Sequence, residues 1–279
     1  MSVTKSLPEA DYDWLAAVRE LRARREPCVI VTLAGVRGHS PRNAGAKMIV
    51  SSGSVSGTVG GGNLEATTIA RARSMIAGGA VEPAMMVIPL NDKVRTEYGR
   101  QCCGGEVTIM LEPVRVPPTI AIFGVGHVGI ELARILSRHE IDLFLVDSRE
   151  DMLTGERLAP IMDGPATIEV RNAPVPESVL AELPASAHVV IMTHDHAEDI
   201  AVCDAALRRP DLASIGLIGS SAKWARFQVQ LRAEGHGDDD LARITTPIGR
   251  RDIAGKDPAA IAVGVAAELL AALTASSVG

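Results

Sequence analysis

One stretch in the second half of the chain strongly limits the folds that it can adopt. The apolar run 120–123 leads directly into Gly124-Val125-Gly126-His127-Val128-Gly129, and a second apolar run ends at Asp147, 18 residues after the last glycine. In such a pattern the first glycine allows a tight turn, the second lets a phosphate approach the backbone, and the third lets helix and strand pack closely. Because the pattern follows an expected strand and precedes an expected helix, it predicts a Rossmann-type fold.

The same stretch supplies candidate binding residues for a nucleotide-like ligand, namely Gly124, Gly126, His127, Gly129 and Asp147. Asp147 would suit ribose hydroxyls and disfavour a 2′-phosphate, although the nearby Arg149 weakens that inference. The pattern predicts the fold better than the ligand, because such sites bind several kinds of molecule. Whether the crevice holds a nucleotide, another cofactor or no ligand stays open.

A proline-rich segment, residues 113–118, divides the chain, because it cannot extend a helix and offers few donors to a sheet. We therefore expect an N-terminal α+β domain over residues 1–115 and a Rossmann-like, doubly wound parallel sheet domain over residues 116–279. The first should contain strands 28–33, 46–51, 84–90 and 106–112 with helices 13–25 and 63–77. The second should contain strands 119–124, 142–147, 167–171, 188–193 and 214–219, helices 128–138, 198–208, 222–234 and 258–273, and a polar loop at 235–240.

The amino-acid composition excludes some classes of binding partner. With 47% hydrophobic residues the chain has ample material for two cores, and it should fold without disulfides. A formal net charge of -6 and 3% aromatic residues argue against nucleic acid, which needs basic patches and stacking rings. Four cysteines, with no secretory signal and no apolar run of membrane-spanning length, lead us to expect a cytoplasmic protein with free thiols that does not bind membranes.

Two of the four cysteines are adjacent and precede two glycines, in Gln101-Cys102-Cys103-Gly104-Gly105. Glycines allow a close approach to the backbone, so a soft sulfur ligand could meet a molecule bound there. The alternative is that one cysteine packs as a small apolar residue and the glycines form the turn into the next strand.

Two glycine-rich loops in the same half are candidate anion sites. Gly60, Gly61 and Gly62 open the helix that carries Glu65, and backbone amides at such a position favour phosphate. Upstream, the loop 37–45 offers Ser40 and Arg42 between two strands. A tight turn alone would also explain its glycines and proline.

A polar cluster, residues 193–199, follows an expected strand of the second domain. His194, Asp195 and His196 should face the same crevice as the glycine pattern, because ligands bind at that side of a doubly wound sheet. They could bind a polar ligand, move a proton or hold a metal. Alternatively, Asp195 or His196 simply caps the next helix.

Taken together, these segments resemble the bacterial xanthine dehydrogenase accessory proteins, the XdhC family. The resemblance runs from Val29 to about Leu273 and rests on an ordered set of motifs. These are Gly38-His39-Ser40-Pro41-Arg42 with Gly45, residues 57–65, 101–105, 124–129 and 193–196, Leu217-Ile218-Gly219-Ser220, Pro247-Ile248-Gly249 and residues 257–263. His39, where a smaller residue is expected, and the Arg250-Arg251-Asp252 continuation depart from the pattern.

The resemblance implies a cofactor chaperone rather than an enzyme of hydride transfer. Such proteins bind molybdenum cofactor (molybdopterin), hold it while a cysteine desulfurase supplies the terminal sulfido ligand, and deliver it to an apo xanthine dehydrogenase-like molybdoenzyme, often as a homodimer. By this reading Cys103 contacts the molybdenum or its sulfido group and Cys102 supports it. Two rival functions stay open: an NAD-dependent oxidoreductase with His194 or His196 as acid–base catalyst, and a nucleotide-sensing regulatory module.

Overall fold

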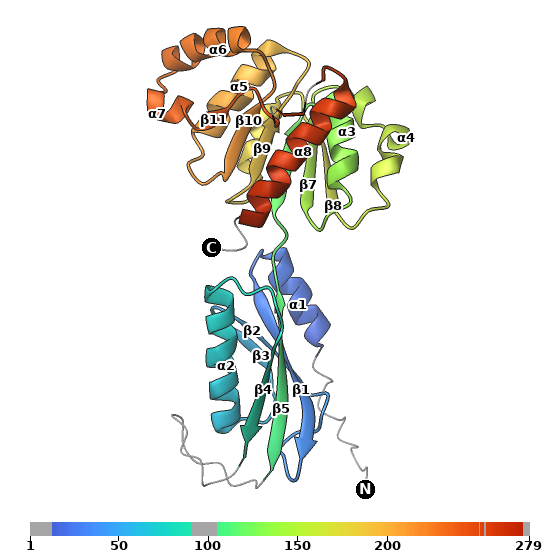
Figure 1. The fold of residues 1–279 in the computed structure, drawn as a ribbon, viewed down its shortest axis with the longest axis vertical. Coiled ribbons are helices and arrows are strands. Elements are labelled where there is room, and N and C mark those ends of the chain that lie inside the picture. Colours follow the sequence, from blue (N-terminus) through green and yellow to red (C-terminus); the bar gives the residue numbers. More distant parts are fainter. Residues whose placement is uncertain (1–12, 91–104, 251, 254, 276–279) are drawn as a thin grey trace, which may run out of the picture. The chain divides into compact units, whose positions relative to one another are not determined.

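The computed structural model describes residues 13–90, 105–250, 252–253 and 255–275, and it divides into two compact units between Val116 and Pro117 (Figure 1). Each unit has its own sheet and its own core. In the described ranges, no helix is both long and apolar enough to cross a bilayer.

The first unit is a five-stranded antiparallel sheet in the order β3-β2-β1-β5-β4, with a helix packed on each face. Its elements are α1 (Trp14–Ala23), β1 (Cys28–Arg37), β2 (Lys47–Ser51), β3 (Val55–Gly57), α2 (Gly62–Ala77), β4 (Ala84–Pro89) and β5 (Glu106–Val114).

Side chains along β1 point alternately to the two faces of the sheet, and this explains why a helix packs on each face. Val29, Val31 and Leu33 point to one face, are fully buried and pack in the same cluster as residues of α2. Cys28 and Ile30 point to the other face and pack with α1. Because successive strand residues face opposite sides, a single apolar strand can serve both cores.

The second unit is a six-stranded parallel sheet in the order β11-β10-β9-β6-β7-β8. Its elements are β6 (Thr119–Phe123), α3 (His127–Leu136), β7 (Asp142–Asp147), α4 (Gly155–Leu158), β8 (Thr167–Asn172), β9 (His188–Ile191), α5 (His196–Leu207), β10 (Ser214–Leu217), α6 (Ser221–Ala233), α7 (Asp238–Leu241), β11 (Ile244–Thr245) and α8 (Pro258–Ala275), with 3-10 turns η1 (Glu150–Leu153), η2 (Ala159–Ile161) and η3 (Pro176–Ala181).

The position of β6 determines where a ligand can enter the second unit. Ala121 and Phe123 face the core shared with α5 and α6, whereas Ile120 and Ile122 face the core shared with α3 and α8. The chain runs outward from β6 to β7 and β8, then returns to β9 on the other side of β6. In doubly wound sheets, ligands bind beyond the carboxyl ends of the strands at such a reversal, which here are β6 and β9.

The α/β fold class with its Rossmann-like domain is confirmed. The structure differs from the expected elements in a few short helices and strands and at the end of one strand. β3, α4 and β11 were not expected, and β5 extends through Val114 into the segment interpreted as a linker. There Pro113 pairs with Val29, while β4 reaches only as far as Leu111. A proline is tolerated where a strand has a single neighbour, because the missing N–H can face the free side.

Candidate functional site

The β1–β2 loop, the loop before α2 and Gly105 at the start of β5 meet at one end of the sheet of the first unit, where β1 ends and β5 begins (Figure 1). A Cβ added at Gly105 would overlap the carbonyl oxygen of His39 and lie 2.7 Å from that of Arg37. A Cβ at Gly60 would lie 3.2 Å from the Cβ of Pro41. The β1–β2 loop therefore packs against Gly105 on one side and against the glycine-rich loop before α2 on the other.

The glycine-rich loop before α2 is held by a carboxylate of the chain itself. Oε1 of Glu65 accepts hydrogen bonds from the backbone N–H groups of Val59 (3.1 Å), Gly60 (3.2 Å) and Gly61 (2.8 Å), and from the hydroxyl of Thr58. Burial alone would raise the pKa of Glu65, but these hydrogen bonds outweigh it and lower the pKa. A phosphate that uses the same three amides would have to displace this carboxylate.

Two other expected binding residues, Ser40 and Arg42, lie in the β1–β2 loop. Oγ of Ser40 is buried and has no hydrogen-bond partner in the part of the chain that the structure describes. Leaving a buried hydroxyl unpaired costs about 1–3 kcal/mol, so the position suits an acceptor or donor supplied by a bound molecule. Arg42 is exposed on the same loop.

The paired cysteines cannot be placed. Gln101, Cys102, Cys103 and Gly104 lie outside the described residues, and the soft-ligand contact stays a prediction. The other two cysteines are free and buried. Burial raises the pKa of Cys28 to about 11, and burial together with Asp199 raises the pKa of Cys203. Because the thiolate is the metal-binding form, neither buried thiol is a good ligand for a soft metal.

In the second unit, the glycine pattern is fixed by close backbone packing. A Cβ at Gly124 would overlap the carbonyl oxygen of Met192, and one at Gly129 would overlap the carbonyl oxygen of Gly124. Gly124 also has a φ of 101°. A Cβ at Gly126 would meet only Nη2 of Arg149, at 4.0 Å. The first and third glycines are therefore required for packing, and the second leaves the backbone open.

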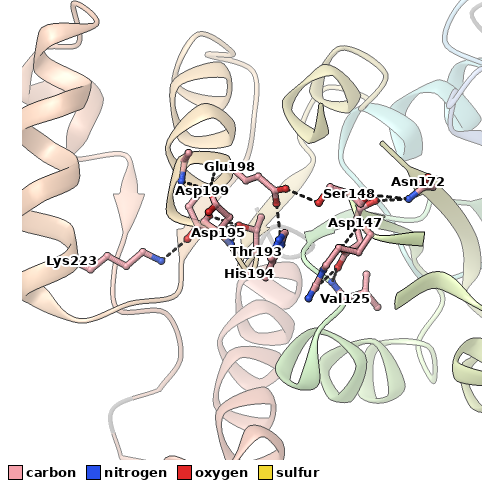
Figure 2. Close-up of polar contacts among 12 residues, drawn as sticks. Val125, Asp147, Ser148, Asn172, Thr193, His194, Asp195, Glu198, Asp199 and Lys223 are labelled. Atoms are coloured by element: carbon pink, nitrogen blue, oxygen red, sulfur yellow. Dashed lines mark hydrogen bonds and ion pairs between the residues drawn. The ribbon is translucent and has the colours of Figure 1, made fainter. Parts of the chain in front are cut away.

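Asp147, at the end of β7, uses its carboxylate within the protein (Figure 2). Oδ2 accepts hydrogen bonds from Val125 N at 2.7 Å and Arg149 Nη2 at 3.0 Å, and Oδ1 accepts from Arg149 N at 3.0 Å and Nε at 2.9 Å. Burial would raise the pKa of Asp147, but the hydrogen bonds from Arg149 and Val125 outweigh it and lower the pKa. Asp147 therefore holds the glycine turn and the Arg149 guanidinium in place.

The polar cluster after β9 divides into a helix cap and a bridge. Oδ1 of Asp195 accepts from Ala197 N at 2.7 Å and Glu198 N at 3.2 Å, which caps α5 and lowers the pKa of Asp195. Glu198 accepts from the hydroxyl of Ser148 at 2.6 Å and lies 3.5 Å from Nδ1 of His194 (Figure 2). This bridge links the carboxyl end of β7 to α5 across the position of β6.

The two remaining expected residues contribute less to this arrangement. His196 begins α5 and meets the ring of Phe227 edge-on, with ring centroids 5.8 Å apart. His127 begins α3 and is exposed. Over the described ranges, no group of three or more His, Cys, Asp or Glu side chains has an arrangement that could hold a metal ion.

Sequence reasoning missed Lys223. Its Nζ donates to Oδ2 of Asp199 at 2.5 Å and to the carbonyl oxygen of Ile218 at 3.0 Å (Figure 2). The other carboxylate oxygen of Asp199 accepts from N and Oγ1 of Thr193, at 3.0 and 2.8 Å. The only signal in the sequence was the position of Lys223 in the first turn of a helix that follows a parallel strand.

The strand order, the glycine turn and the acid at the end of β7 together define a Rossmann-type domain. The chain belongs to the XdhC family. Residues 120–269, more than half of the chain, match the family described as the XdhC Rossmann domain, and residues 21–87 match the XdhC and CoxI family.

Individual similar proteins were also found. The chain is 25% identical over 262 residues to the uncharacterized protein YqeB of Escherichia coli K12, covering 90% of this chain but only 44% of YqeB. A solved structure from Bacillus halodurans, described as a xanthine dehydrogenase, is 19% identical with a TM-score of 0.47, covering 94% of this chain and 96% of that one. A structure of TcdA (CsdL) is 14% identical with a TM-score of 0.42, covering 57% and 88%.

Proposed function

We propose that this protein binds molybdenum cofactor, holds it during sulfuration and delivers it to an apo xanthine dehydrogenase-like molybdoenzyme. Membership of the XdhC family supports the general role in maturation of such an enzyme. In this proposal the client molybdoenzyme and a cysteine desulfurase are the two partners, and the chain works as a homodimer. The protein itself is a carrier, and the desulfurase carries out the sulfur chemistry.

One observation supports this function most directly: the expected binding motifs of the first unit meet at one end of its sheet. Gly105, the last residue of the cysteine motif, packs on the β1–β2 loop, and this loop contains Ser40 and Arg42. A molybdenum centre held by a dithiolene is soft and favours a thiolate neighbour, and the pterin phosphate favours hydroxyl, amide and guanidinium donors. Gly105, two residues after Cys103 in the sequence, lies against the loop that carries the hydroxyl and guanidinium donors, and this contact supports the proposal.

We assign roles to the residues of these motifs as follows. Cys103 contacts the molybdenum or its sulfido ligand, and Cys102 supports that contact. Ser40 supplies a hydroxyl that has no partner among the described residues, and Arg42 neutralises the phosphate. Glu65 keeps the neighbouring glycine-rich loop in its conformation, so that Gly60 stays packed on the Ser40 loop.

The decisive measurement is the molybdenum and pterin content of protein purified from a cofactor-replete host. Molybdenum and pterin in comparable amounts support the proposal, whereas tight NADH binding with neither one supports an oxidoreductase instead. A Cys103→Ala variant should lose most of the molybdenum and transfer little to an apo-enzyme. Cys28→Ala, which removes a buried thiol of the same unit, is the matched control and should retain the cofactor. Unimpaired retention and transfer by Cys103→Ala would contradict the assignment.

A second variant separates binding from folding. Ser40→Ala removes a buried hydroxyl without a described partner, so it should leave the thermal unfolding midpoint unchanged or raise it slightly. The same variant should retain less pterin. A drop in stability with full pterin retention would show that the hydroxyl has a purely structural role.

A further inference from the structure

The carboxylate of Asp147 has no capacity left for a ligand. A carboxylate has about four lone-pair positions, and the four hydrogen bonds from Val125 and Arg149 use them. The side chain is also only 2% exposed. In NAD-type Rossmann sites the acid at this strand end accepts hydrogen bonds from the ribose hydroxyls. Asp147 cannot do so while it holds Arg149.

Arg149 is oriented toward the ligand side of the same strand end. Two of its nitrogens, Nε and Nη2, are bound to Asp147, and its side chain remains 30% exposed. Nη2 lies 4.0 Å from the point where a side chain at Gly126 would begin. Nη1 has no acceptor among the residues that the structure describes. The guanidinium is thus a fixed cation at the end of β7, at the position where a Rossmann site contacts the ribose 2′ group.

A second guanidinium lies on the same turn. Arg157 donates from Nη2 to the carbonyl oxygen of Val125 at 3.2 Å and from Nε to that of Met152 at 3.3 Å. Two arginines from the connection between β7 and β8 therefore flank the Val125–Gly126 peptide. A planar guanidinium held in a fixed direction favours the oxygens of a phosphate over the hydroxyls of a sugar.

We propose that Arg149 makes the ligand side of this strand end selective for a nucleotide whose ribose carries a second phosphate ester, on its 2′-hydroxyl, and that Asp147 is the positioning residue for Arg149. This reverses the preference that the bare sequence pattern suggests. The proposal concerns a ligand other than molybdenum cofactor, and its test needs no molybdenum.

Acidic side chains near Arg149 limit its affinity for a phosphate group. Besides Asp147, the carboxylates of Asp151 and Glu198 are close enough to contribute to the raised pKa of Arg149. The negative charge of Glu198 is partly compensated, because the Ser148 hydroxyl donates a hydrogen bond to its carboxylate and Nδ1 of His194 lies 3.5 Å away. We therefore expect moderate binding that weakens as salt is added, since both attraction and repulsion here are electrostatic.

The test compares 2′,5′-ADP with 5′-AMP by calorimetric titration of the full chain. We expect 2′,5′-ADP to bind at least about tenfold more tightly, the factor that a charge-assisted hydrogen bond typically provides. Arg149→Ala should remove the difference while changing 5′-AMP binding much less. Arg138→Ala, an exposed arginine of the same unit paired with Asp163, should leave the difference intact. Equal affinities, tighter 5′-AMP binding, or binding of neither nucleotide overturns the proposal.

A measurement on the unaltered protein covers the case in which Arg149→Ala does not fold. In ³¹P spectra of 2′,5′-ADP, added protein should shift or broaden the 2′-phosphate resonance more than the 5′-phosphate resonance. A perturbation confined to the 5′-phosphate would contradict the role of Arg149.

Discussion

Lys223 and Asp199 form an ion pair that solvent barely reaches, with side chains 12% and 1% exposed. Asp199 belongs to α5 and Lys223 to α6, and each also bonds to the chain that leaves the preceding strand, through Thr193 and Ile218. The pair therefore fixes the two helices that follow β9 and β10 relative to the strand ends.

Removing one partner of this pair should be costly. Lys223→Met leaves a buried carboxylate without its cation, and we expect a loss of about 3–5 kcal/mol in the free energy of unfolding. The double variant Asp199→Asn/Lys223→Met should recover much of it, because no unpaired charge remains. Denaturant unfolding checks both. Arg232→Ala, which breaks the exposed pair with Asp238, should change stability by less than about 1 kcal/mol.

The third glycine of the pattern should not tolerate even a methyl group. Alanine in place of Gly129 gains about 1 kcal/mol of helix propensity, but its Cβ would overlap the carbonyl oxygen of Gly124. We expect Gly129→Ala to destabilise the second unit by about 2–4 kcal/mol because the backbone must shift. Gly155→Ala is the control and should be neutral or slightly stabilising, because a Cβ added at this helical position would meet no atom within 4 Å beyond its chain neighbours and its own helix backbone. A stable Gly129→Ala protein would contradict this packing.

The hydrogen bonds to Glu65 should make stability depend on pH. The folded-state pKa of Glu65 is lowered below its ordinary value of 4.5, so the stabilisation is present above that value and is lost as pH falls through the folded pKa. Glu65→Gln should cost about 1–2 kcal/mol at pH 7, and the difference from the native protein should shrink below pH 4.5. Thermal unfolding of both proteins from pH 7 to pH 3 measures this. Glu82→Gln, at an exposed position, should show no such trend.

Asp195 should behave as a helix cap. Asp195→Ala should lower the stability of the second unit, because two amides at the start of α5 lose their acceptor. Asp195→Ser restores a capping oxygen without the charge and should recover most of the loss. If serine restores the stability but not the binding of a nucleotide, Asp195 also contacts the ligand.

The sequence allowed most of the second unit to be predicted, because a short local pattern carries most of its information. The turn from Gly124 to Gly129 and the alternation of strands and helices each follow from near neighbours in the chain. The short strands β3 and β11 were missed, since three and two residues provide no periodicity.

Side-chain partners were harder to foresee than elements. Asp147 had the expected position, but its saturation depends on Val125, 22 residues away. Lys223 reaches Asp199 only because the sheet places β10 beside β9. Glu65 was expected near a phosphate, and the structure shows it binding the same amides itself. Each of these contacts depends on tertiary geometry that local pattern cannot supply.

The carboxylate of Glu65 gives the first unit a built-in competitor. Any phosphate that reaches the amides of Val59, Gly60 and Gly61 exchanges with a group that is tethered a few residues away and is always present. The tethered carboxylate lowers the affinity of these amides for phosphate. It binds the amides again as soon as the phosphate leaves, so their hydrogen bonds are always made. In the proposed role as a cofactor carrier, such a site would favour fast release over tight retention.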